Sequence, residues 1–163
     1  MTSYTSPHTL LALSIALAGI SPLAGATTWQ LDDDWALNSN TTLSLGTSWS
    51  LQNPDKALLN KADAATIGKV GKGTNYNGDD GKLNFKRGDV ISTVFKGLSD
   101  FELNGGSRGA FVRFKYWYDH AMATGNGDFR KFDDSGWQDL ARFQGVQVLD
   151  AYLWQDFDVA ERP

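Results

Sequence analysis

The residues that could perform catalysis or bind metal ions show no spacing that matches a familiar site. The sequence contains no cysteine, which excludes a disulfide framework, a zinc finger and a cysteine nucleophile. Residues 68–74 (GKVGKGT) have the glycine spacing of a phosphate loop, but Gly73 is followed directly by Thr74, where the motif requires a lysine. Because no strand is predicted before this segment, we predict a flexible loop and no nucleotide site.

Asn75, Asn77 and Asp79 have the spacing of three ligands in a calcium-binding loop. Asp80 occupies the position where that loop requires glycine, and Lys86 the position of its bidentate glutamate, so an EF-hand is excluded. Two alternatives stay open for Asp79 and Asp80, namely a looser Ca²⁺ site and an acidic surface turn.

The sequence offers no specific arrangement of catalytic groups. His120 is the single histidine after residue 26, and nothing in the linear sequence places a nucleophile and an orienting acid beside it. A carboxylate pair for glycoside hydrolysis could be chosen freely from 19 acidic residues, so it indicates nothing. We therefore predict that the chain is not an enzyme and that it uses no metal and no cofactor.

The charge balance argues against a nucleic acid as partner. Lys and Arg number 15 against 19 Asp and Glu, and the basic residues form no cluster that could follow a phosphate backbone. An aromatic content of 12% is too high for a disordered chain, so a folded protein is expected.

Residues 1–26 are predicted to be a secretory signal peptide. The run 10–20 is apolar, and Pro22 and the small residues 24–26 follow it, which favours cleavage after Ala26. The run is too short for a membrane-spanning helix, which takes about 20 residues. A buried apolar helix is the alternative.

After this segment, four stretches alternate apolar and polar residues with a period of two, which predicts strands with one apolar and one polar face. They cover 40–51, 90–104, 110–119 and 148–158. In the first stretch the alternation is unbroken. All four are long for a soluble domain, but they suit tilted transmembrane strands of about 9–11 residues.

The alternation assigns side chains to the two faces of such a sheet. Charged residues of both signs lie on the polar side, and the lumen-facing candidates among them are Lys96, Asp100, Glu102, Arg113 and Lys115. The lipid-facing candidates on the apolar side are Leu43, Leu45, Phe95, Val112 and Phe114. In the alternative interpretation, the polar side is simply a solvated sheet face.

The connection between the second and third strands is short enough to suggest a register. Pairing Asp100 with Arg113 brings opposite charges together, whereas shifting the strands to pair Lys96 with Lys115 sets like charges against each other. We favour the first register. A looser one, which pairs Glu102 with Arg113, stays open.

The connections are long, short and long: 52–89, 105–109 and 120–147. This order is typical of outer-membrane barrels, in which large loops lie on one side of the membrane and tight turns on the other. In the first connection, Asn53 as cap and Pro54 at the first helical position predict one short helix over 54–67. A secreted β-sandwich with irregular loops is the alternative.

Aromatic side chains lie near the predicted strand ends, as in the interfacial girdles of barrels. They are Trp35, Trp49, Tyr116, Tyr118 and Phe157. The aromatic core of a sandwich is the competing interpretation.

Three sequence blocks, 84–88 (NFKRG), 116–119 (YWYD) and 149–152 (LDAY), resemble the amino-terminal part of a proteobacterial outer-membrane family called domain of unknown function 1302. The resemblance implies an exported outer-membrane protein and a passage for hydrophobic compounds, and it supplies no catalytic residues. At the position of Arg162 and Pro163 the family pattern usually reads Gly-Arg-Pro and continues into another strand, whereas here Glu161 precedes the Arg-Pro pair.

We therefore predict an all-β fold, an antiparallel meander of about four long strands. Because the smallest natural barrels have about eight strands, residues 27–163 are expected to be an amino-terminal fragment of a larger transmembrane outer-membrane β-barrel. The expected role is a porin-like pore or transport wall in a Gram-negative outer membrane, with the lipid bilayer as partner and a small hydrophobic solute as cargo. A soluble exported β-sandwich that binds a ligand such as carbohydrate through exposed tryptophans is the alternative.

Overall fold

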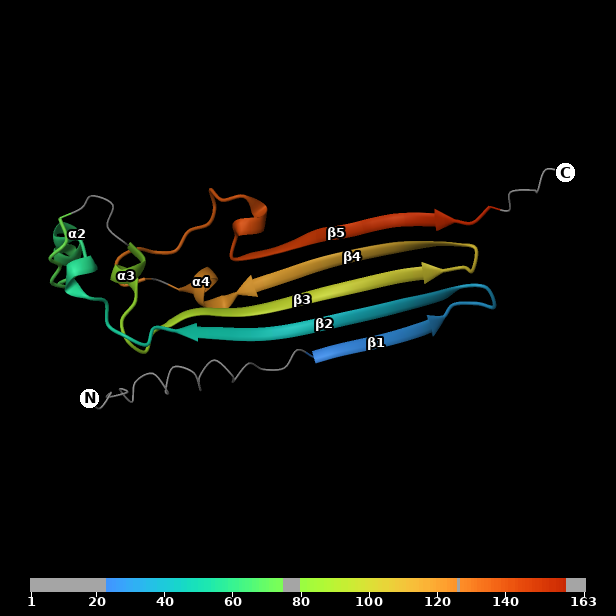
Figure 1. The fold of residues 1–163 in the computed structure, drawn as a ribbon, viewed down its shortest axis with the longest axis horizontal. Helices are drawn as coiled ribbons and strands as arrows, with labels where there is room; N and C mark the ends of the chain where they lie inside the picture. Colours follow the sequence, from blue (N-terminus) through green and yellow to red (C-terminus); the bar gives the residue numbers. More distant parts are fainter. Residues whose placement is uncertain (1–22, 75–79, 126, 158–163) are drawn as a thin grey trace, which may run out of the picture.

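A single antiparallel β-sheet dominates the computed structural model, which describes residues 23–74, 80–125 and 127–157 (Figure 1). Its five strands follow one another in chain order, and each is hydrogen-bonded to the next. They are β1 (Leu23–Gln30), β2 (Ala36–Trp49), β3 (Val90–Asn104), β4 (Arg108–Asp119) and β5 (Gln144–Gln155). The predicted all-β antiparallel meander is confirmed.

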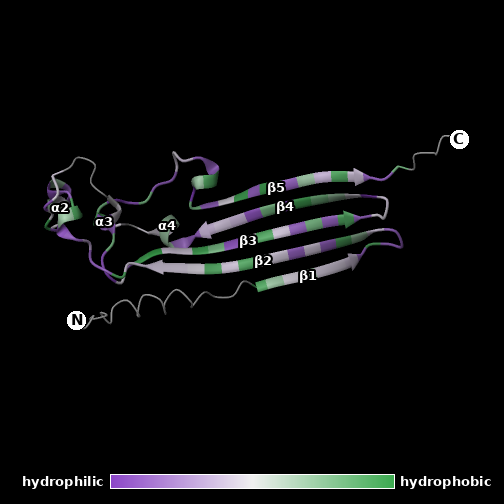
Figure 2. Cartoon of the chain, in the orientation of Figure 1, coloured by the Kyte–Doolittle hydropathy of each residue, from purple (hydrophilic) through white to green (hydrophobic). Residues whose placement is uncertain are grey.

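Side chains alternate between the two faces of the sheet. Figure 2 shows this alternation as hydrophilic and hydrophobic bands along β2 to β5. The register places residues of one kind opposite each other, so that Leu43 pairs with Leu23, and Leu45 with Phe95. We call the side that carries Leu43 the apolar face, and the side that carries Asp100 the polar face.

The prediction of about four strands missed β1. This strand begins at Leu23 and includes residues 24–26, so it crosses the point where signal cleavage was predicted. Residues 1–22, the rest of that predicted signal, lie outside the described residues. The sequence of β1 (LAGATTWQ) is rich in small residues and shows no alternation of large apolar and polar side chains. This segment is therefore a strand because it pairs with β2, and its own sequence pattern does not predict it.

Two tight turns join strands at one end of the sheet, on the right in Figure 1. Between β1 and β2, Asp32 Oδ1 accepts hydrogen bonds from the N–H groups of Asp34 (2.9 Å) and Trp35 (2.8 Å). Asp32, the first of three consecutive aspartates at 32–34, therefore fixes this turn. Between β3 and β4, Gly106 adopts a φ of 74°, a conformation that glycine reaches without steric cost.

A bulge in β5 explains why the sequence pattern placed its start too late. Consecutive residues of β4 pair with Asp150 and then with Val148, which leaves Leu149 as the extra residue. The bulge shifts the alternation by one residue, so Val148 lies on the apolar face and Asp150 on the polar face. The strand consequently begins at Gln144, ahead of the predicted start at 148.

The single helix predicted over 54–67 is wrong, because two shorter helical segments occupy that range. Asn60 interrupts the helix and caps the second segment by accepting from the N–H groups of Ala62 (2.8 Å) and Asp63 (3.1 Å). The predicted cap, Asn53, instead accepts from the N–H of Arg87 at 3.0 Å.

In the described part of the chain, the helical segments lie in the two long connections. They are η1 (Lys56–Leu58), α2 (Lys61–Thr66), α3 (Asp80–Asn84), α4 (His120–Thr124) and η2 (Asp139–Ala141). None of the helices in the described residues has the length and apolar character needed to cross a membrane.

The two long connections pack together at the other end of the sheet (Figure 1). We call their described parts, within 50–89 and 120–143, the loop cap. Its small core contains the buried side chains of Leu59, Ala64 and Leu83, with Ile67 and Phe129 packed against them.

The segment 68–74, predicted to be a flexible loop, is held in the cap by backbone hydrogen bonds. Gly73 N donates to Leu59 O at 2.8 Å and Gly73 O accepts from Lys61 N at 2.9 Å. The glycine-rich pattern therefore has a structural role in this cap.

The sheet has no comparable core. Among the described residues, none of the large apolar side chains of the strands is buried. Leu45 is 46%, Val148 59% and Leu153 82% exposed. The described residues thus provide no second layer over either face of the sheet.

Candidate functional site

The polar face brings together the five residues predicted to face a lumen. Their register positions place Lys96, Asp100 and Glu102 of β3 on the same side of the sheet as Arg113 and Lys115 of β4.

Asp100 and Arg113 form a forked ion pair near the middle of this face. Arg113 Nε lies 2.7 Å from Asp100 Oδ1, and Arg113 Nη2 lies 2.6 Å from Asp100 Oδ2. The two residues are register partners, so the favoured register is confirmed and the looser one is excluded. Asp150 is the β5 partner of Arg113 and adds a second carboxylate beside the guanidinium. Such a bidentate pair holds both side chains in one geometry.

Glu102 lies toward the tight turns and has no ion-pair partner among the described residues. Its Oε1 accepts a hydrogen bond from Asn104 Nδ2 at 3.1 Å. Together with Asp100, Asn38 and Phe111 it lines a shallow hollow of about 430 Å³ on the polar face.

Lys96 and Lys115 lie toward the loop cap and likewise have no ion-pair partner among the described residues. Lys96 is opposite Trp117 in the register, and the Nζ of Lys115 lies 5.3 Å from the centroid of the Trp117 ring. With Leu140 from η2, these residues line a second hollow of about 330 Å³.

The Trp117 ring is fixed by its neighbours. Its Nε1 donates to Arg142 O at 2.8 Å, and the ring lies over Gly145, its register partner in β5. A Cβ at Gly145 would come within 2.6 Å of the ring, so only glycine allows this contact. The polar N–H of the indole is therefore already satisfied within the protein.

The apolar face carries the five residues predicted to contact lipid. Leu43, Leu45, Phe95, Val112 and Phe114 all occupy this side in the register. Phe114 stacks on Phe101 with ring centroids 5.7 Å apart, and Tyr116 continues the row at 6.1 Å from Phe114. These rings form a band across β3 and β4.

Aromatic residues also stand at both ends of the apolar face. Trp49 is the last residue of β2, and Tyr118 comes one residue before the end of β4. At the turn end, Trp29 lies near the end of β1, and Trp35 packs over Gly105, where a Cβ would come within 2.7 Å of its ring. Phe157, another predicted aromatic, follows the end of β5 and is 76% exposed.

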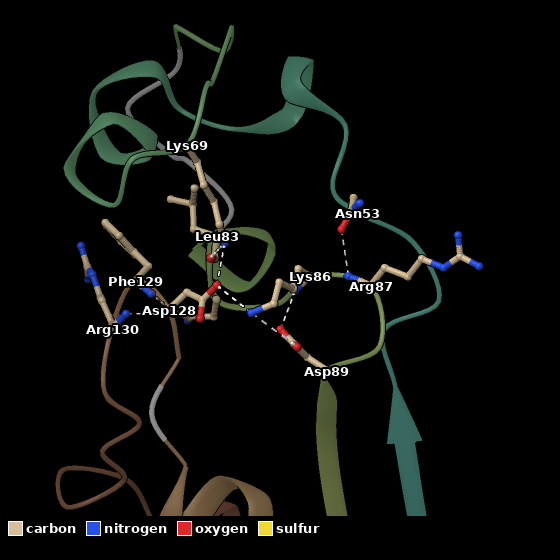
Figure 3. A network of polar contacts seen from close by, with 10 residues as sticks. Asn53, Lys69, Leu83, Lys86, Arg87, Asp89, Asp128, Phe129 and Arg130 are labelled. Carbon is tan, nitrogen blue, oxygen red and sulfur yellow. Dashed lines mark hydrogen bonds and ion pairs between the residues drawn. The ribbon is translucent and has the colours of Figure 1, made fainter.

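Two lysines and an aspartate join the two loops of the cap (Figure 3). Lys69 Nζ donates to Asp128 Oδ2 at 3.1 Å and to Leu83 O at 2.7 Å, and Lys86 Nζ lies 3.7 Å from Asp128 Oδ2. The hydrogen bond and charge of Lys69, with that of Lys86, lower the pKa of Asp128 below its ordinary value.

Asn84 makes a second connection between the loops. The residue is 8% exposed, and its side-chain Oδ1 accepts from the N–H groups of Phe129 (3.0 Å) and Arg130 (2.9 Å). Asp128 N in turn donates to Asn84 O at 3.3 Å. One amide side chain thus satisfies two backbone donors of the other loop.

Comparison with protein-family models identifies the family of this chain. The chain matches a family model described as "Protein of unknown function (DUF1302)" over residues 8–163. The chain belongs to this family. The resemblance drawn from the three sequence blocks is confirmed, whereas comparison with curated proteins and with solved structures gives no match.

Two further polar residues of this DUF1302 chain, Asp119 and His120, contact neighbouring side chains or backbone groups. Asp119 accepts hydrogen bonds from Ser92 Oγ and Thr93 N, and the ring of His120 lies 6.1 Å from that of Tyr118. In the described part of the chain, no three His, Asp or Glu residues are close enough to hold a metal ion. The open question of a Ca²⁺ site at 79–80 lies outside the described side chains.

Proposed function

We propose that this DUF1302 chain forms part of the wall of an outer-membrane β-barrel in a Gram-negative bacterium. In this proposal it acts as a porin-like pore or transport wall for a small hydrophobic solute and catalyses no reaction. The observation that carries the proposal is a long sheet with one apolar and one polar face, neither of which is covered by other described residues.

Exposed apolar surface of this extent is unusual in a soluble monomer. The apolar face presents large side chains from all five strands, and contiguous patches beyond a few hundred Å² usually mark an interaction surface. Lipid is a suitable partner because the opposite face is polar, as in the wall of an aqueous channel. A sandwich would need a second sheet over the apolar face, and the described residues form only one.

The strand lengths suit a bilayer. The strands β2 to β5 contain 12 to 15 residues, which span about 40–50 Å at about 3.3 Å per residue. A tilt of about 40° reduces this length to about 30–38 Å along the membrane normal, which is sufficient for a hydrocarbon core of about 30 Å.

The ends of the sheet differ in the way that barrels require. Both described long connections lie at one end of the sheet, and both tight turns lie at the other. This arrangement supports a barrel wall in which successive strands cross the membrane in opposite directions. The tryptophans and tyrosine at the two ends of the apolar face lie where interfacial girdles are expected. A closed barrel needs about eight strands, so the free edges of β1 and β5 would pair with further strands of the wall.

Nitroxide scanning of the full chain in lipid vesicles tests the proposal. Spin labels at Leu43, Phe95 and Val112 should be accessible to oxygen dissolved in the lipid, whereas labels at Ser44 and Arg113 should be accessible to a water-soluble nickel chelate. Labels on the apolar face that neither reagent reaches would indicate a protein core and overturn the proposal. Fractionation of cells gives an independent test, because a barrel segment stays with the membrane until detergent is added and a soluble sandwich leaves with the periplasm.

A further inference from the structure

We infer that Lys96, Lys115 and Trp117 form a binding site for a small organic anion with an apolar body, such as an aromatic carboxylate. The inference rests on the proposed function for its setting, because it names the class of solute that the polar face would hold. The binding itself depends only on the geometry of this face.

The first argument is charge. Lys96 and Lys115 are diagonal neighbours on adjacent strands, since Lys96 pairs with Trp117 and Lys115 is two residues before it. Diagonal neighbours are about 7–8 Å apart, within reach of long side chains, so two ammonium groups can approach one carboxylate. Bringing two cations together without a described counter-ion is unfavourable in the empty site and becomes favourable when an anion enters.

Nearby acids are already engaged by other partners. Asp119, the closest acid along β4, accepts hydrogen bonds from Ser92, Thr93 and Met122. Asp139, next to Leu140, is 91% exposed and lies 3.4 Å from Arg142. Asp100, the other diagonal neighbour of Lys115 in the register, is held by Arg113 through both of its carboxylate oxygens. None of these three carboxylates forms an ion pair with Lys96 or Lys115 among the described residues.

The second argument is shape. The hollow of about 330 Å³ lies between strands β3 and β4 and the η2 segment of the loop cap, and it is lined by both lysines, Trp117 and Leu140. Leu140 is 55% exposed, and the Trp117 N–H is bonded to Arg142 O, so both offer apolar surface to a ligand. This volume lies at the lower end of the range of about 300–1,000 Å³ found for small-molecule sites.

The third argument is pre-organisation. Gly145 and the carbonyl of Arg142 hold the indole in place, and Lys115 already lies against its ring. A ligand therefore orders few side chains when it binds, which lowers the entropic cost of binding. An aromatic ring stacked near Trp117 with its carboxylate toward the lysines fits this arrangement.

Isothermal titration of the detergent-solubilised full chain with 2-naphthoate at about pH 7 tests the inference. The matched probes are 2-naphthol, which has the same ring and no charge, and 2-naphthylmethylammonium, which has the opposite charge. We expect naphthoate to bind and the other two to bind at least about tenfold more weakly. Equal affinity for all three probes would overturn the inference.

The matched variants are K96Q/K115Q and, as control, K56Q/K72Q, which removes two exposed lysines from the loop cap. Affinity for naphthoate should fall at least about tenfold in the first and stay unchanged in the second. Raising the salt from about 50 to about 500 mM should weaken naphthoate binding to the unsubstituted chain, because salt screens charge, and this arm needs no variant. Unchanged affinity in K96Q/K115Q or no effect of salt would refute the site. Nitroxide accessibility judges the membrane wall separately, so each proposal can fail alone.

Discussion

An arginine placed at the middle of β2 should reveal which face of the sheet meets lipid. Leu43 and Thr42 are adjacent residues near the centre of this strand, both half-buried, and they lie on the apolar and the polar face respectively. Leu43→Arg and Thr42→Arg therefore add the same side chain at the same depth, on opposite sides. Only the first should be strongly unfavourable.

An arginine on the lipid face at the bilayer midplane costs about 2–4 kcal/mol. At 1.36 kcal/mol per factor of ten, this corresponds to a fall of about 30- to 900-fold in the folding equilibrium. Thr42→Arg points to the proposed lumen, where surface substitutions usually change stability by less than about 0.5 kcal/mol.

Urea titration of the chain in lipid vesicles, followed by tryptophan fluorescence, measures this difference. With a slope of about 2 kcal/mol per molar urea, the midpoint should fall by about 1–2 M for Leu43→Arg and by less than about 0.3 M for Thr42→Arg. Equal shifts in the two variants would refute the assignment of faces, and so would a neutral Leu43→Arg.

Three further predictions concern the cap and the first turn. Lys69 lowers the pKa of Asp128 in the folded state, so this carboxylate stabilises the cap at pH values above its ordinary pKa of about 4. The stabilisation should disappear as the pH falls below that value. Amide exchange of the cap should show this pH dependence, and Asp128→Asn should abolish it. Asn84→Ala leaves the N–H groups of Phe129 and Arg130 without their acceptor and should destabilise the cap by about 1–3 kcal/mol. The expected result is faster proteolysis of the second loop. An unchanged rate of proteolysis would contradict the bridging role of Asn84. Asp32→Ala removes the acceptor that fixes the β1–β2 turn and should speed hydrogen exchange of the amides of Asp34 and Trp35 without changing exchange in β4. Equal acceleration in the turn and in β4 would point to a general loss of stability.

Strong local patterns made the central strands predictable. Unbroken alternation predicted β2, and charge pairing predicted the register of β3 and β4 through Asp100 and Arg113. Both signals are local or depend on one short turn, so the sequence carries them directly.

Features that depend on tertiary contacts were missed. The small residues of β1 form a strand because β2 pairs with them, and the bulge at Leu149 reverses the alternation within β5. The junction of Lys69, Asn84 and Asp128 joins residues from loops far apart in the chain, and no spacing rule relates them. The fixed position of Trp117 likewise requires Gly145 from another strand.

The first long connection leaves and re-enters the sheet through a narrow stem. Ser50 N donates to Asp89 O at 2.9 Å, and Ser50 O accepts from Gly88 N at 2.7 Å, so the two ends of the connection are clamped directly above β2 and β3. Insertions and deletions beyond this stem can be accommodated without moving the strand register. A substitution in one strand has to fit the residue that pairs with it in the neighbouring strand. The cap, in contrast, can be exchanged as a module, provided that both of its loops are replaced together. The stem is thus a natural grafting point for presenting a foreign peptide or a new binding loop on this sheet.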